Sequence, residues 1–175
     1  MDTAVNQEGK WVVGLTQTIT TTFVRPNDAN AYTAGDVISS TTAASVAPIL
    51  QFPNIVRSNG GGGIIQSAVL IDSVAAATKP DTELYLFDQI ITMQSDNAVW
   101  APLDAEMLNC VGVIAFPVGA FKTAGANGII DVTGLGKAFN CAASSTTLYG
   151  VLVARNAYTP TALEQFELRL QVLQD

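Results

Sequence analysis

The chain has 175 residues and a net charge of −7, so its surface should repel phosphate backbones and nucleic-acid binding is disfavoured. Hydrophobic residues make up 49% of the chain and charged residues only 13%, compared with about 25% charged residues in typical soluble domains. The chain contains no histidine, which removes the commonest general base and the commonest metal ligand.

The low charge has a consequence for the surface, which must be covered by uncharged polar residues or buried against partners. Such a composition is typical of an all-β protein in a large assembly. The polar first eight residues lack the features of a signal peptide. The longest apolar stretch, residues 110–121, is too short to span a bilayer. We therefore expect no membrane partner and synthesis in a cytoplasm.

The N-terminal part of the chain divides into an arm and a strand. Residues 1–14 show no clear period and are predicted to form an irregular arm. Residues 15–24 alternate, with threonine at every second position on one face, which favours a strand because β-branched side chains suit a pleated surface. Residues 25–30 carry the turn-forming residues that end it.

The most informative stretch is a run of four glycines, residues 60–63, followed by two apolar segments. Residues 64–72 are continuously apolar, as expected for a strand buried on both faces. Residues 83–88 form a second predicted strand, and each strand ends on an aspartate.

The other strand predictions are short apolar or alternating segments bounded by Gly, Pro and Asn: 32–38 (a turn entering a strand), 46–52 (an edge or bulged strand), 111–116, 128–132, 137–141, 148–155 and 166–173. Residues 102–108 are the best candidate for a short helix, with proline near its start and acids in its first turn. Asn127 and Gly128 are predicted to form a hairpin turn.

The final strand has the clearest pattern, because Phe166, Leu168, Leu170 and Val172 point to one face and polar residues alternate with them. No regular helices lie between the predicted strands, which disfavours a βαβ architecture. The predicted fold class is all-β: an antiparallel two-sheet β-sandwich, jelly-roll-like, with at most one short helix. The domain prediction is an N-terminal arm over 1–14 and one β-sandwich domain over 15–175.

The glycine run does not match a phosphate-binding loop. Such a loop needs Gly-Lys-Ser/Thr, whereas Gly63 is followed by Ile64. A dinucleotide-binding loop opens a helix, whereas this run opens a strand. The run is therefore interpreted as a flexible hairpin or a place of close backbone contact.

Five acids are candidates for a catalytic pair or a calcium site: Asp72, Asp88, Asp96, Asp104 and Glu106. Glycosidase chemistry needs two carboxylates at a defined separation, which this spacing does not fix. A calcium loop needs acids at alternating positions around a glycine, and no such run exists. We assign these acids to strand ends and turns. The site prediction is therefore no catalytic, cofactor-binding or metal-ligating residue, no cofactor and no enzymatic activity.

Cysteine and aromatic residues give weaker signals. The separation of Cys110 and Cys141 fits no zinc motif, and two reduced, buried thiols are favoured over a disulfide. Trp100, in a predicted loop, is the better candidate for contact with a partner or a sugar, whereas Tyr85 and Tyr149 lie in strands and are assigned to the core.

Several segments occur in an order that resembles small virion proteins of tailed bacteriophages, a group encoded with capsid genes that includes head decoration, or cement, proteins. The likeness extends over about residues 32–175 and rests on these segments: 35–38, 60–63 leading into 64–72, 83–88, 95–98, 148–155, 158–160 and 168–173.

This resemblance implies a β-sandwich cement protein on the exterior of a phage capsid, where it would bind the major capsid protein and stabilise contacts between its subunits. It also implies a homo-oligomer, either a trimer or a dimer, and no catalytic residues. Two alternatives stay open at this point. One is a tail, neck or receptor-binding module that contacts a host glycan through Trp100 and residues 95–97. The other is a glycan hydrolase that uses Asp88 or Asp104.

Overall fold

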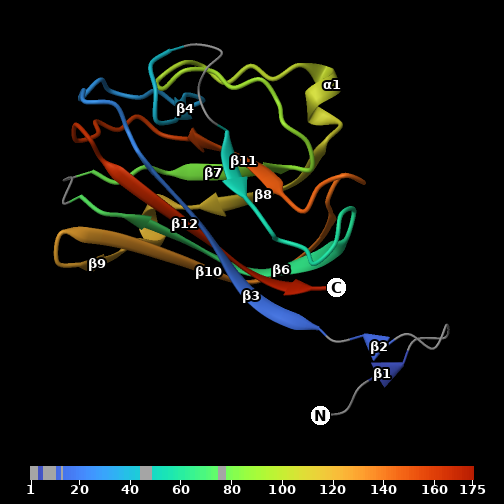
Figure 1. The fold of residues 1–175 in the computed structure, drawn as a ribbon. Coiled ribbons are helices and arrows are strands. Elements are labelled where there is room, and N and C mark those ends of the chain that lie inside the picture. Colours follow the sequence, from blue (N-terminus) through green and yellow to red (C-terminus); the bar gives the residue numbers. More distant parts are fainter. Residues whose placement is uncertain (1–3, 6–10, 13, 44–48, 75–77) are drawn as a thin grey trace.

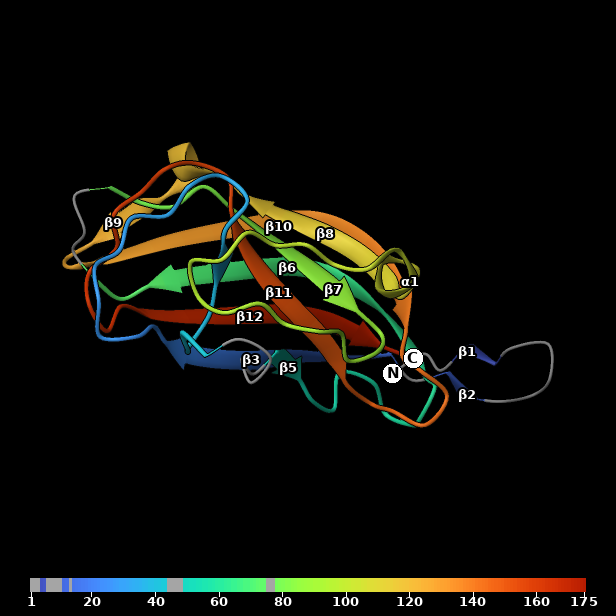
Figure 2. The ribbon, with the colours of Figure 1, turned by 90° about the horizontal axis from the view of Figure 1, so that it is seen from above.

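Two five-stranded antiparallel sheets face each other in the computed structural model, which describes residues 4–5, 11–12, 14–43, 49–74 and 78–175 (Figures 1 and 2). Within these residues there is one α-helix, α1 (Asp104–Met107), and one short 3-10 helix, η1 (Val118–Ala120). No helix in the described part of the chain is long and apolar enough to cross a membrane.

The first sheet contains the longer strands. Its order is β3 (Leu15–Val24), β12 (Gln165–Gln174), β6 (Gly62–Asp72), β10 (Asn127–Asn140) and β9 (Lys122–Ala124). The second sheet has the order β4 (Val37–Ile38), β11 (Leu148–Ala154), β7 (Thr82–Phe87) and β8 (Cys110–Phe116), and β5 (Leu50–Phe52) also pairs with β11.

The strand order defines a jelly roll. Strands β3, β12, β6 and β10 lie next to one another in one layer, and β4 with β5, β11, β7 and β8 form the facing layer. The chain crosses repeatedly between the layers, and the first and last long strands, β3 and β12, are neighbours. The predicted antiparallel β-sandwich is therefore confirmed, and its strand order is that of a jelly roll.

The main core lies between the two sheets, where alternate residues of each strand point inward. In β12, Phe166, Leu168, Leu170 and Val172 are fully buried, which confirms the face predicted from the sequence. Leu84 and Leu86 of β7 face them from the second sheet in the same cluster.

A second, smaller core covers the outer face of the second sheet. Phe87, Val151 and Val153 on that face pack against Ile91 and Met93 of the long connection between β7 and β8. Among the described residues, the first sheet has no such cover along β6. Ile64 is exposed and Val69 and Ile71 are half-buried, so the prediction that residues 64–72 are buried on both faces was wrong.

Two predicted strands prove to be one. β10 includes residues 128–132 and 137–140, and its pairing with β6 shifts at a bulge between Thr133 and Lys137. The hairpin turn lies at residues 125–126, and Asn127 and Gly128 already belong to β10, so the predicted turn position was wrong.

The short helix was located correctly, although it is shorter than predicted. α1 begins after Leu103, which is the N-cap, so Pro102 precedes the helix instead of occupying its first turn.

Strand β9 was not predicted. Part of the predicted strand 46–52 and most of the predicted arm lie outside the described residues. Within the arm, β1 (Ala4–Val5) pairs with β2 (Trp11–Val12) as a separate two-stranded sheet.

Candidate functional site

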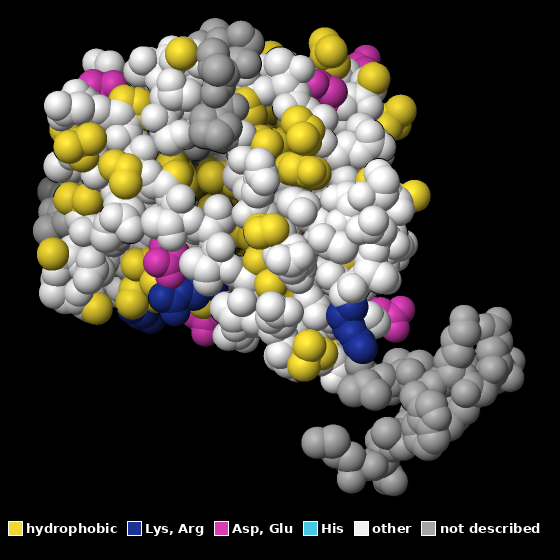
Figure 3. All heavy atoms as spheres, in the orientation of Figure 1, with side chains coloured by type: hydrophobic (Ala, Val, Ile, Leu, Met, Phe, Trp, Pro, Cys, Tyr) yellow, Lys and Arg dark blue, Asp and Glu magenta, His cyan; other side chains and the backbone are white. Residues whose placement is uncertain are grey.

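The most distinctive surface feature is a concentration of exposed apolar side chains around α1. Ten large hydrophobic side chains are exposed among the described residues. Four of them lie in α1, next to it or in the segment bonded to it, and define the surface that we call the α1 patch: Ile90, Leu103, Met107 and Leu108. Val99 is also exposed, but it pairs with Asp36 beside β4 and lies outside this patch. Leu108 is the most exposed of all, at 87%. Figure 3, in the orientation of Figure 1, shows hydrophobic side chains at the surface near α1.

Hydrogen bonds hold this part of the chain in place. The Glu106 carboxylate accepts hydrogen bonds from the backbone N–H groups of Leu103 (2.9 Å) and Thr92 (2.7 Å). These two bonds lower the pKa of Glu106, because they favour its charged form. The Asp88 N–H also donates to the carbonyl of Asn109 (3.1 Å). The segment that carries Ile90 is therefore bonded to α1 and to the chain just after it.

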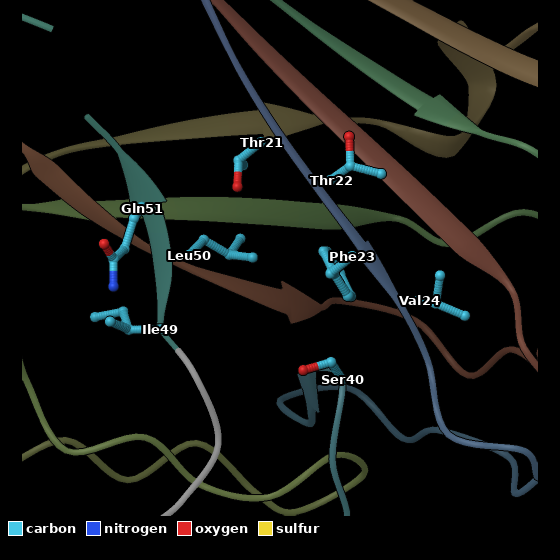
Figure 4. Close-up of a pocket in the computed structure, with 8 residues that line it drawn as sticks. All are labelled: Thr21, Thr22, Phe23, Val24, Ser40, Ile49, Leu50 and Gln51. Carbon is cyan, nitrogen blue, oxygen red and sulfur yellow. The ribbon is translucent and has the colours of Figure 1, made fainter. Parts of the chain in front are cut away.

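A pocket of about 360 Å³ opens at the side of the sandwich, between one edge of each sheet (Figure 4). Residues 21–24 of β3 line one wall, and Ser40 with residues 49–51, which include β5, line the other. Figure 4 shows Phe23 and Leu50 on opposite sides of this space. We call this the β3–β5 pocket. Its lining carries no charged side chain, so it is suited to an apolar or neutral occupant.

Asp96 was predicted to shape a turn, and it does so from within a buried ion pair. Its carboxylate lies 2.7 Å from Nη2 of Arg25, whose side chain is fully buried. The carboxylate also accepts hydrogen bonds from the Tyr32 hydroxyl (2.6 Å) and the Ser39 N–H (2.8 Å). Tyr32 in turn stacks on Tyr158, with ring centroids 5.0 Å apart. Asp96 is thus saturated with structural partners.

Asp72 is one of the two acids predicted at strand ends. It is fully buried and lies 2.7 Å from the Lys79 ammonium. Its carboxylate neighbours Glu164, a buried residue that the sequence analysis did not single out. Burial and the Asp72 carboxylate raise the pKa of Glu164 to about 8, so this carboxyl keeps its proton at neutral pH. Burial, followed by the Glu164 carboxyl, also raises the pKa of Tyr158.

The remaining predicted acids lie elsewhere. Asp88 follows β7, Asp104 begins α1 and Glu106 is bonded to backbone N–H groups, so none of these acids joins the buried carboxyl pair. Across the part of the chain that the structure describes, no group of three or more Cys, Asp or Glu residues could hold a metal ion.

Trp100 is positioned by packing. Its ring is half-buried and lies 4.2 Å from the Tyr85 ring and 6.4 Å from the Phe87 ring, measured between centroids. It therefore contributes to the smaller core, and Tyr85 and Tyr149 pack there as half-buried residues. Because neighbouring rings occupy Trp100, it is a poor stacking platform for a sugar.

The glycine run makes close backbone contacts. A Cβ at Gly63 would lie 2.9 Å from the carbonyl oxygen of Leu173 and 3.1 Å from the Phe139 ring, and one at Gly62 would lie 2.6 Å from Oδ1 of Asn140. Gly60 has a φ of 70°. The close-contact interpretation of residues 60–63 is therefore correct, and β6 needs these glycines in order to fit between β10 and β12.

The two cysteines are free thiols. Cys141 is buried and Cys110 is half-buried. Burial, with a smaller contribution from the Asp88 carboxylate, raises the pKa of Cys141 to about 11, which keeps this thiol protonated and unreactive.

Comparison with known proteins gives a limited result, since no family model and no curated protein matches this sequence. Among solved structures, the chain is similar to a chain in the capsid of Ralstonia phage GP4 (17% identity, 100% of this chain and 92% of that chain covered, TM-score 0.45). It is also similar to a chain in the cyanophage Pam1 capsid asymmetric unit (10% identity, 98% and 99% covered, TM-score 0.37). A third similar chain is VP2 of the infectious bursal disease virus subviral particle (11% identity, 91% and 32% covered, TM-score 0.36). These low identities and TM-scores assign neither a family nor a function to this chain.

Proposed function

We propose that this protein is a structural component of a bacteriophage virion, a decoration protein that binds the outer surface of the head and stabilises contacts between major capsid subunits. The observation that carries the proposal is the α1 patch, where four of the ten large hydrophobic side chains exposed among the described residues lie in α1, next to it or in the segment bonded to it. Clustered exposed apolar side chains on a soluble protein mark surfaces that bind other macromolecules. The ordered sequence likeness to phage virion proteins supports the major capsid protein as the partner.

The physical requirements of this role agree with the chain. A shell under internal pressure needs contacts across its subunit seams, and a decoration protein supplies burial there without covalent chemistry. Specific binding needs an interface of about 1,000 Å² or more, and many identical copies reinforce one another through avidity. The net charge of −7 favours a position outside the shell, away from packaged DNA.

The contact surface can be tested by mutation. In a Leu103→Asp/Leu108→Asp variant, two carboxylates would have to be desolvated on binding, so occupancy on heads that lack the protein should fall at least about tenfold. Val118→Asp is the matched control, because Val118 is also exposed, at 41%, but lies outside the α1 patch. Equal loss of occupancy in both variants, or no loss in either, contradicts the assignment of this surface.

A tail, neck or receptor-binding role is the alternative. Copy number separates the two roles, since a decoration protein is present in hundreds of copies per particle and a tail or neck component in a handful. Quantitative mass spectrometry of purified particles measures this ratio against the major capsid protein.

A further inference from the structure

The free edge of β3 is unusual in its composition. β3 pairs with β12 along one side, and no strand in the described residues pairs with its other side. Its ten residues, Leu-Thr-Gln-Thr-Ile-Thr-Thr-Thr-Phe-Val, include no charged residue, no proline and no glycine. Natural proteins normally protect an edge strand of this length with charges, proline or a bulge, because unpaired N–H and C=O groups recruit another strand. β5 approaches this edge across the β3–β5 pocket described above, but no strand in the described residues hydrogen-bonds to it, so the edge can accept another strand.

The same edge carries an exposed apolar side chain at one end and a pocket at the other. Leu15, the first residue of β3, is 49% exposed. Phe23, near the other end, lines the β3–β5 pocket of about 360 Å³. Leu15, Ile19 and Phe23 point to the same face of the strand, because side chains alternate along it. A protruding side chain and a recess thus occupy opposite ends of one strand, on the same face.

We propose that the free edge of β3 binds the β3 edge of a second copy of this chain, in an antiparallel pair around a twofold axis at Ile19. In this register Leu15 lies opposite Phe23 of the second copy, and Ile19 lies opposite its own equivalent. Directly opposed residues in an antiparallel pair point to the same face. Each Leu15 side chain therefore meets Phe23 at the mouth of the other copy's β3–β5 pocket, and the symmetry makes this contact twice.

The properties of the strand select a second copy as the occupant. Only a copy of the same strand places a leucine over each pocket and receives one in return. On the opposite face, the register pairs Thr16 with Thr22 and Thr18 with Thr20, which are compatible β-branched pairs. The strand itself carries no charge, so the net charge of −7 on each copy is not concentrated at the contact. A threefold axis cannot pair one strand with its own equivalent, so the geometry specifies a dimer.

This inference concerns the isolated protein and does not depend on binding to phage heads. The α1 patch and the β3 edge share no residue, so each can be disrupted alone.

Sedimentation velocity of the full chain tests the proposal. Over micromolar to high-micromolar concentrations, the wild-type protein should show a reversible monomer–dimer equilibrium. Leu15→Glu should raise the dissociation constant at least about tenfold, because it would place a carboxylate against Phe23 of the second copy. Leu108→Glu changes an exposed leucine of the α1 patch and should leave the dimer intact. A monomeric or trimeric wild-type protein, or an unchanged dissociation constant for Leu15→Glu, overturns the proposal.

Cross-linking tests the register independently of any loss of stability. In a Cys110→Ser background, Thr18→Cys/Thr20→Cys places two cysteine pairs opposite one another across the axis and should give a covalent dimer on mild oxidation. Thr20→Cys alone should not cross-link, because Thr20 lies opposite Thr18. No cross-link in the double variant, or an efficient cross-link in the single one, contradicts the pairing around Ile19.

Discussion

Leu170 shows how strictly one position in β12 is determined. Its side chain is fully buried between the sheets, whereas Gln171, the next residue, is exposed on the outer face. Leu170→Asp buries a carboxylate without a partner, which costs several kcal/mol, so we expect this variant not to fold. Gln171→Asp is the control. It removes the hydrogen bond that Gln171 accepts from the Ser67 hydroxyl but leaves the new carboxylate at the surface, so it should change the free energy of unfolding by only about 1 kcal/mol. Near-wild-type melting of Leu170→Asp, measured by circular dichroism, contradicts the core assignment.

Glu164 makes stability depend on pH in a direction opposite to that of most carboxylates. The groups around its carboxyl are Asp72, Arg25 and Tyr158, and Lys79 pairs with Asp72. The pKa of Glu164 is about 8 in the folded protein, against 4.5 ordinarily, so the folded state holds a proton that the unfolded state has lost. The protonated Glu164 carboxyl therefore contributes fully to the free energy of unfolding below pH 4.5. This contribution is lost as the pH rises towards about 8, the pKa of Glu164 in the folded protein.

Comparison of the wild-type protein with Glu164→Gln isolates this effect. Between pH 4.5 and about 8, the free energy of unfolding of the wild-type protein should fall by a few kcal/mol as Glu164 ionises. The variant should not show this fall, because the amide cannot ionise. Urea unfolding at several pH values in this window measures both slopes. If the free energy of unfolding depends on pH in the same way in both proteins, Glu164 is already ionised in the folded state and the assignment is wrong.

The burial of Arg25 could not be predicted from the sequence. It stands in a run typical of a turn, beside Pro26, yet its side chain is fully buried against Asp96, 71 positions away. Nothing in the local pattern distinguishes this arginine from an exposed one, because its environment is created by three loops that meet only in the folded chain. Glu164 was missed for the same reason.

At the scale of elements, a glycine is required in β6 but not in η1. A Cβ at Gly63 would press on the carbonyl of Leu173 and the Phe139 ring, whereas one at Gly119, in η1, would meet nothing within 4 Å. Gly63→Ala should therefore destabilise the protein by about 1–3 kcal/mol. Gly119→Ala should be nearly neutral. Chemical denaturation measures both, and equal effects would show that the first sheet adjusts freely at this point.

Strands with a strong local pattern could be predicted, and those set by distant contacts could not. The alternation in β12 depends on its own residues, and its buried face was identified correctly. β6 is equally apolar, but whether its outer face is covered depends on elements from elsewhere in the chain. In β10, Gly134 and Gly136 look like strand breakers, yet both adopt positive φ values, 69° and 57°, in a bulge that lets the strand continue.

The candidate surfaces were less accessible to sequence analysis than the fold. The helix at residues 102–108 was predicted, but the exposure of its leucines was not, because an apolar residue in a short helix is ordinarily assumed to face the core. The sequence directed attention to Trp100 instead, and packing against Tyr85 occupies that side chain.

At the scale of the whole molecule, the N-terminal arm and the sandwich should be separable. Deletion of residues 1–14 removes no strand of either five-stranded sheet, so the melting temperature should change little. We propose that the arm lies along a neighbouring subunit of the shell, so its deletion should lower occupancy on heads. Quantitative gel analysis of purified particles measures this, and equal occupancy of the truncated and full-length proteins shows that the arm has no such role.

The two proposed surfaces would act together in an assembled particle. A twofold dimer through β3 presents two α1 patches, and a bivalent contact strengthens binding without any additional interface per copy. Leu15→Glu should then weaken attachment to heads indirectly, by separating the pair, while leaving each α1 patch unchanged.

The most direct test of the account is to add the purified protein to phage heads that lack it. We expect saturable binding in hundreds of copies per head, visible as regular density on the outer surface by electron microscopy, and a higher temperature of head disruption. Failure to bind any head over a range of salt concentrations, or binding that leaves the disruption temperature unchanged, would contradict the proposed role.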